Sequence, residues 1–185
     1  MVDSFYYVCE GYDESEVELH VVVPIRKVDR AASWAPDAGA DEEVRFAFYY
    51  GGDLECEVRV GPREEEGRLV YKSLGHQAWL DLLYAVDLMK SERMYPESEG
   101  LKIWVQDGHL YILIDENTLR AFKEWSFGVT EHILNRGRRL RFRFYYPDSK
   151  GVECEVENEA NILIYKTIDK NAWLSLLDIF SLHSA

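Results

Sequence analysis

The chain has 185 residues, of which 47% are hydrophobic, and a formal net charge of −13 at pH 7. This length is enough to bury a core in one domain or in two small ones. The excess of carboxylates disfavours broad binding to nucleic acid or anionic membranes, because that affinity comes from Lys and Arg side chains. Without a run of ~20 apolar residues or a signal-peptide pattern at its start, the sequence predicts a cytoplasmic protein.

Alternating apolar residues predict five strands in the first half of the chain. The predicted strands are residues 5–10, 16–23, 44–50, 54–60 and 68–72. Residues 28–35 form a weak helical segment that ends at Pro36. An amphipathic helix closes this half, because four apolar side chains recur at i, i+3, i+4 and i+7. They are Trp79, Leu82, Leu83 and Val86.

The second half begins with the clearest local signal, an Asp107-Gly108 turn between two alternating runs. This pattern predicts a hairpin of residues 101–106 and 109–114 with a type I′ turn, in which Trp104 faces Tyr111. A helix capped by Asn117 is expected next. The remaining predicted strands are residues 140–146, 152–157 and 162–166. The apolar stripe of the predicted final helix consists of Trp173, Leu176, Leu177 and Phe180.

The last third of the chain repeats its middle with a period of roughly 90 residues. Residues 45–50 return as 141–146 and residues 71–74 as 165–168. We therefore predict an α+β fold made by internal duplication. Two pseudo-twofold-related halves, residues 1–92 and 93–185, would each be an antiparallel sheet backed by a C-terminal amphipathic helix, in one compact body.

This strand-strand-strand-helix order is similar, at the level of topology, to the saddle of the TATA-binding protein family. None of the motifs of that family is present in the chain. The acidic charge also removes the physical basis for gripping DNA in that family's way, so the resemblance implies no function.

Catalytic and metal-binding motifs are missing from the sequence. The three cysteines include no CxxC pair, and the five histidines show neither HxH nor HExxH spacing. We expect no catalytic residue, no metal and no cofactor. Two questions stay open: whether Cys56 and Cys154 pair, and whether distant residues assemble a site.

The negative charge is concentrated in the first half. Residues 1–92 hold 9 Lys and Arg against 20 Asp and Glu, a difference of −11, whereas residues 93–185 hold 12 against 14, a difference of −2. We predict a non-catalytic binding protein that docks a basic protein through an acidic surface, with Glu64, Glu65 and Glu66 at its centre. The low content of Gln, Thr and Asn also suits a thermophilic origin.

Two further features give alternatives that stay open. Arg139, Arg141 and Arg143 share one strand face, where they either bind single-stranded nucleic acid or pair with the carboxylates at 153, 155 and 157. Trp104 and Tyr111 either form an exposed hot spot for a partner or are covered as core. A third hypothesis is a small-molecule enzyme with its site between the halves.

Overall fold

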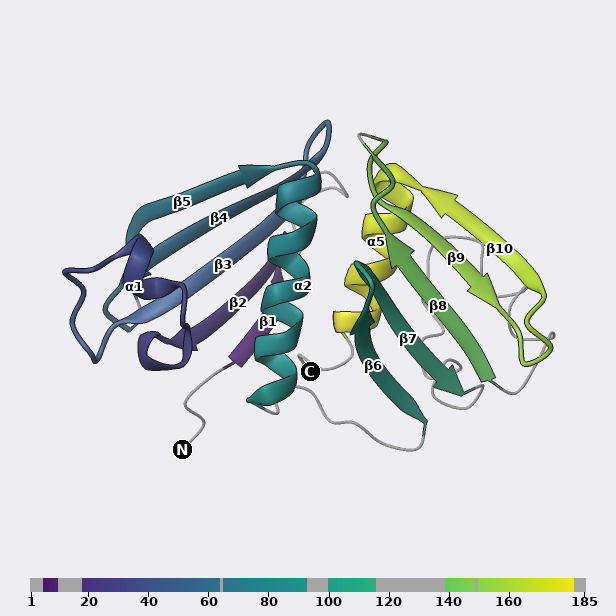
Figure 1. Ribbon diagram of the computed structural model, residues 1–185, viewed down its shortest axis with the longest axis horizontal. Helices are drawn as coiled ribbons and strands as arrows, with labels where there is room; N and C mark the ends of the chain where they lie inside the picture. The colour runs from purple at the N-terminus through teal and green to yellow at the C-terminus, as the bar shows by residue number, and fades with distance from the viewer. Residues whose placement is uncertain are drawn as a thin grey trace. The chain divides into compact units, whose positions relative to one another are not determined.

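The computed structural model describes residues 5–9, 18–63, 65–92, 100–115, 139–148 and 150–181, except the side chains of residues 5–9, 178 and 181. The chain divides into two compact units, Met1–Tyr95 and Pro96–His183, here called unit 1 and unit 2. Each unit contains an antiparallel sheet with a helix packed against it (Figure 1). The predicted α+β class is therefore confirmed.

Unit 1 contains sheet A, in which every strand pairs with its neighbour in the chain. A 3-10 helix, Ile25–Lys27, and the short helix α1 (Ala31–Trp34) follow the second strand, in place of the predicted segment 28–35. The helix α2 (His76–Ser91) ends the unit and contacts the last three strands. The strands are β1 (Phe5–Cys9), β2 (Glu18–Pro24), β3 (Glu43–Tyr50), β4 (Leu54–Gly61) and β5 (Arg68–Leu74).

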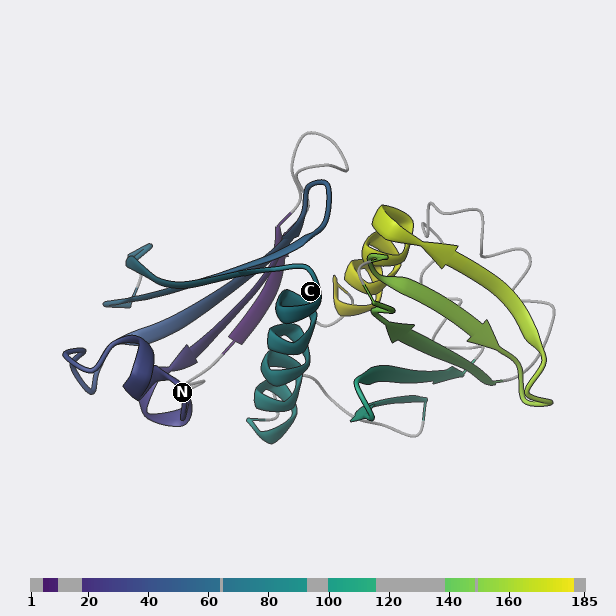
Figure 2. The same cartoon turned by 45° about the horizontal axis from the view of Figure 1, so that its top comes forward.

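Unit 2 contains sheet B, whose strand order again follows the chain. The helix α5 (Asp169–Ser181) contacts the last two strands (Figure 2). The helix predicted after Asn117 lies outside the described residues. The strands are β6 (Leu101–Gln106), β7 (His109–Asp115), β8 (Arg139–Tyr145), β9 (Glu153–Glu157) and β10 (Leu163–Ile168).

Strict alternation of apolar and polar residues gives each sheet one buried face. We call the face that packs against the helix the inner face and the opposite one the outer face. Phe46 and Phe48 of β3 are completely buried on the inner face of sheet A. Phe142 and Phe144 of β8 are at most 1% exposed on the inner face of sheet B. Each such side chain contributes roughly 1.5–3 kcal/mol by leaving water. The tryptophans of the two helical stripes are only 1% exposed, as predicted: they are Trp79 and Trp173.

The hairpin of β6 and β7 has the predicted register and turn. Gln106 lies opposite His109, and Trp104 lies opposite Tyr111. The turn residues Asp107 and Gly108 have φ values of 52° and 78°. Positive φ at both central residues is what a type I′ turn requires, and Asp and Gly tolerate it better than most residues.

The last strand of each sheet carries an irregularity. The pairing of β5 with β4 shifts register between Val58 and Arg59, and the pairing of β10 with β9 shifts between Leu163 and Tyr165. Such β-bulges bend a strand and increase its local twist. Lys72 of β5 and Lys166 of β10 point to the outer face, each opposite a glutamate of the neighbouring strand.

Candidate functional site

The predicted site residues of unit 2 lie on the outer face of sheet B, and in unit 1 Glu65 and Glu66 lie in the loop between β4 and β5. In each sheet, the cross-strand register places four side chains in a row on the outer face. The row of sheet A crosses β2 to β5, and the row of sheet B crosses β7 to β10. The row in sheet A is Val22, Arg45, Arg59 and Leu69. The corresponding row in sheet B is Leu113, Arg141, Glu157 and Leu163.

A hollow of about 230 Å³ lies at one end of the outer face of sheet A. Two of the predicted acidic residues, Glu65 and Glu66, line it, whereas Glu64 lies outside the described residues. The Glu66 side chain is 78% exposed, and its Oε1 lies 3.7 Å from Nε of Arg59. The surroundings of the loop between β4 and β5 are therefore less acidic than its sequence indicates, because arginine side chains lie among the carboxylates. Those lining the hollow are Arg45, Arg59 and Arg63.

The arginines of sheet B form two of the expected cross-strand ion pairs. Arg141 pairs with Glu157 and Arg143 pairs with Glu155. The third expected carboxylate, Glu153, is instead 3.3 Å from Nζ of Lys166, because the register places Tyr145 opposite it on β8. The remaining arginine of the ladder, Arg139, lies opposite Asp115 of β7.

An aromatic cluster covers the neighbouring part of the same outer face. The rings of Trp104 and Tyr111 stack with centroids 5.2 Å apart and an interplanar angle of 8°. His109 stacks on Tyr145 at 5.3 Å, and the Arg143 guanidinium lies 4.9 Å above the Tyr145 ring. Trp104 and Tyr111 are half-buried, so they are neither a fully exposed hot spot nor part of the core.

The environment of His109 favours its neutral form. Burial, followed by the positive charge of Arg143, lowers the pKa of His109 below the ordinary 6.5, although Asp107 opposes this. A neutral imidazole in an aromatic row supports stacking and adds no charge to this face.

Large aliphatic side chains are exposed mainly on the last strand of each sheet. Among the residues that the structure describes, six are at least 36% exposed, and five of these lie in or next to β5 and β10. Leu69 and Leu163 occupy matching positions in the repeat, as do Leu74 and Ile168. The six are Leu69, Leu74, Leu80, Ile162, Leu163 and Ile168.

The chain matches no protein-family model, no curated protein and no solved structure. In the described part of the chain, no helix has the length and apolar character of a membrane span. The same residues contain no group of three or more His, Cys, Asp or Glu side chains placed to hold a metal ion.

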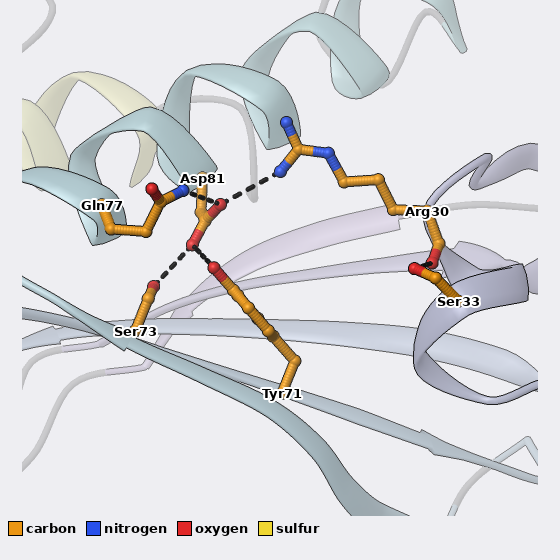
Figure 3. Close-up of polar contacts among 6 residues, drawn as sticks. All are labelled: Arg30, Ser33, Tyr71, Ser73, Gln77 and Asp81. Carbon is orange, nitrogen blue, oxygen red and sulfur yellow. Dashed lines mark hydrogen bonds and ion pairs between the residues drawn. The ribbon is translucent and has the colours of Figure 1, made fainter.

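Unit 1 also contains a buried polar network centred on Asp81, which is 1% exposed (Figure 3). Its Oδ2 accepts hydrogen bonds from the hydroxyls of Tyr71 at 2.8 Å and Ser73 at 2.5 Å. Its Oδ1 accepts from Nη1 of Arg30 at 3.1 Å and from Nε2 of Gln77 at 3.2 Å. The network ties the segment before α1 to α2 and β5.

The hydrogen bonds of the Asp81 network stabilise unit 1 and leave the carboxylate poorly suited to acid–base chemistry. Four donors occupy the two carboxylate oxygens, which leaves little capacity to take up a further proton or ligand. The Arg30 guanidinium also lies 4.1 Å above the Tyr84 ring. In α5 the matching residue of the repeat is Ser175, whose hydroxyl donates to the Asn171 carbonyl at 2.9 Å. Unit 2 therefore has a simpler bond at this position.

The two repeat-related cysteines are free thiols. Cys56 and Cys154 are completely buried in their separate units and form no disulfide. Burial strongly raises the pKa of both thiols. They are therefore small core residues and poor nucleophiles.

The sequence reasoning missed several residues of this surface, namely Arg45, Arg59, Leu69 and Leu74. For Arg59, however, the sequence does contain an indication. Comparing the two copies of the repeat position by position places Arg59 where the second copy has Glu157. Such a charge reversal in an otherwise matching strand marks a place where the two faces differ.

Proposed function

We propose that this chain is a non-catalytic binding protein that docks a basic protein partner through the outer face of sheet A. The observation that carries the proposal is the placement of the exposed aliphatic side chains. Single exposed apolar residues are ordinary, but here they gather on one strand of each sheet, at matching positions of the repeat. On β5 they are Leu69 and Leu74, which are 47% and 60% exposed.

The charges beside β5 support a basic partner. Lys72 lies 3.7 Å from Glu55 and 3.8 Å from Glu57, so one cation serves two carboxylates. In sheet B the carboxylate matching Glu57 has a second cation, Arg143, but sheet A has Ala47 at that position. A basic side chain of the partner would occupy the space above Ala47.

Tyr49 supports the same assignment of charge. Burial, followed by the charges of Glu57 and Glu55, raises the pKa of the Tyr49 phenol. The part of this rise that comes from the two carboxylates reflects a negative local potential, which Lys72 only partly offsets. Glu64, Glu65 and Glu66 would extend this potential along the β4–β5 loop and steer a basic partner toward β5.

The repeated surface also supports an internal duplication in which each half is a binding unit. β10 presents Leu163 and Ile168, with Lys166 and two glutamates beside them. Two related surfaces on one chain would engage two related segments of a partner, and linked binding raises overall affinity without any new kind of contact.

Affinity capture from nuclease-treated lysate of the native host tests the proposal. Wild-type bait is compared with Leu74→Ser, which removes apolar area, and with a Glu65→Lys, Glu66→Lys double variant. Leu80→Ser is the control, because Leu80 is an exposed leucine of α2 outside this surface. The partner should be retained by wild type and by the control, and lost or depleted with the other two baits.

Binding kinetics with the purified partner then separate steering from contact. The charge reversals should slow association roughly tenfold at low salt and change dissociation less, with the difference shrinking as salt rises. A partner whose binding ignores both salt and these reversals would contradict the electrostatic docking. Recovery of nucleic acid alone, from lysate without nuclease, would favour the arginine surface of sheet B instead.

A further inference from the structure

The outer face of sheet A lacks one arginine that its counterpart in sheet B has. In sheet B, Arg143 forms an ion pair with Glu155 of the neighbouring strand, and its guanidinium lies 4.9 Å from the centre of the Tyr145 ring. The repeat has Ala47 at the position of Arg143. The short side chain of Ala47 leaves this position of sheet A without a guanidinium.

Both groups that hold the arginine in sheet B are nevertheless repeated in sheet A. The register places Glu57 directly opposite Ala47, just as it places Glu155 opposite Arg143. Two residues further along β3, the tyrosine of the second copy is repeated as Tyr49. Sheet A therefore keeps a carboxylate and a phenol ring around a position that has lost its cation.

The lysine of the last strand does not take the place of the missing arginine. Lys72 lies 3.8 Å from Glu57, and the matching Lys166 lies 4.0 Å from Glu155. In sheet B the carboxylate of Glu155 contacts both Lys166 and Arg143, one at each oxygen. The Glu57 side chain is 24% exposed, against 15% for Glu155. Glu57 can therefore accept a second cation without losing Lys72.

The neighbour on the other side of the position is an aromatic ring in both sheets. On β2 the residue opposite Ala47 is His20, and on β7 the residue opposite Arg143 is Tyr111. Nε2 of His20 lies 2.9 Å from a carboxylate oxygen of Glu18. The position above Ala47 thus has a ring towards β2 and a carboxylate towards β4, in the arrangement that sheet B has around its arginine.

We propose that an arginine side chain of the basic partner fills the position above Ala47, with its guanidinium stacked on the Tyr49 ring and paired with Glu57. This inference rests on the proposed docking of a basic partner and specifies one contact of it. A planar guanidinium stacks on a phenol ring and binds a carboxylate through two parallel hydrogen bonds, whereas an ammonium is a compact and strongly hydrated charge. The partner therefore needs arginine, and not lysine, at this contact.

Titration of ¹⁵N-labelled wild-type protein with N-acetyl-arginine amide tests the site without the partner. Ionic strength is held constant with sodium chloride. N-acetyl-lysine amide has the same charge, and N-acetyl-citrulline amide has nearly the same shape without charge. The backbone amides of Ala47, Tyr49 and Glu57 should shift saturably with the arginine compound, more weakly with the lysine compound and not at all with the citrulline compound. Absence of a saturable shift, or an equal response to all three compounds, would overturn the proposal.

Filling the position from within the chain provides the second test. Ala47→Arg recreates the arrangement of sheet B, so it should melt no lower than wild type while its affinity for the arginine compound falls at least about tenfold. Ala32→Arg is the matched control, because it adds the same charge at an exposed alanine of α1. Glu57→Gln keeps the side chain at nearly the same size and should weaken binding as well. Unchanged binding in Ala47→Arg and Glu57→Gln, or its loss in Ala32→Arg, would refute the assignment.

The two proposals fail in different experiments. If affinity capture recovers a basic partner but the arginine compound does not bind, the assignment of the Ala47 position is wrong and the docking stands. If the compound binds as described but wild-type bait recovers no basic partner, the docking is wrong and the arginine site stands. With a purified partner, Ala47→Arg should weaken binding at least about tenfold and Ala32→Arg should not.

Discussion

Replacing Asp81 by Ser gives unit 1 the residue that the repeat has at the matching position, Ser175. The shorter side chain removes the carboxylate that accepts four hydrogen bonds. The donors differ in how much they lose. Ser73 is 8% exposed and has little access to water, whereas Gln77 is exposed and re-forms its bonds with solvent.

The expected loss of stability follows from those exposures. A buried donor left without an acceptor costs roughly 1–3 kcal/mol, and this applies to Ser73. The half-buried Tyr71 hydroxyl loses a bond with a net contribution of about 1 kcal/mol. The Arg30 side chain is 43% exposed, so its ion pair adds at most about 1 kcal/mol after screening. Relief from burying a carboxylate offsets part of the total, leaving a loss of about 3 kcal/mol.

Native-state hydrogen exchange measured by mass spectrometry localises the effect. Asp81→Ser should speed exchange in residues 76–91 of α2 and leave residues 169–181 of α5 unchanged, since the two helices belong to separate units. Ser175→Ala is the matched control and should cost less than about 1 kcal/mol, because its bond is one neutral contact within a helix. Unchanged exchange in α2, or equal effects in both helices, would refute the cohesive role of Asp81.

Three other outcomes are expected. Arg141→Ala should lower the free energy of unfolding by at most about 1 kcal/mol in urea titrations, because its side chain is 40% exposed; a loss above ~3 kcal/mol would mean a desolvated pair. Burial raises the pKa of Cys56 and Cys154 above the ordinary 9.0. The unfolded chain therefore loses those protons first, and stability should fall above about pH 9 with a slope that Cys56→Ala reduces. Because the pKa of His109 is lowered from 6.5, its neutral form stabilises the fold above pH 6.5, and this contribution is lost as the pH falls below 6.5. An NMR titration of His109 with a midpoint at or above 6.5 would contradict this expectation.

Much of the fold was predictable because its signals are local. The Asp107-Gly108 turn and the alternation on either side of it specify the register of β6 and β7, down to the contact of Trp104 with Tyr111. Alternation likewise specifies which side chains of β3 and β8 are buried. The apolar stripes of α2 and α5 identify Trp79 as core, because their spacing requires no knowledge of the partner sheet.

The site was less predictable because it depends on tertiary contacts. Asp81 lies off the apolar stripe of α2, and nothing local indicates that donors from β5 and from the segment before α1 converge on it. The loop of Glu65 and Glu66 appears purely acidic in sequence, yet Arg59 reaches it from the neighbouring strand. Net charge summed along a segment misses such mixing, because the opposite charges come from elsewhere in the chain.

The bulges and lysines of β5 and β10 have a consequence for solubility. A terminal strand with exposed leucines would ordinarily recruit strands from other molecules and promote aggregation. Lys72 and Lys166 place a charge in the middle of each such strand, and the bulges twist it away from flat pairing. We therefore expect the lysines and the bulges to oppose strand pairing between molecules at these two edges. Removing both lysines should therefore increase the tendency of the chain to assemble into β-rich aggregates.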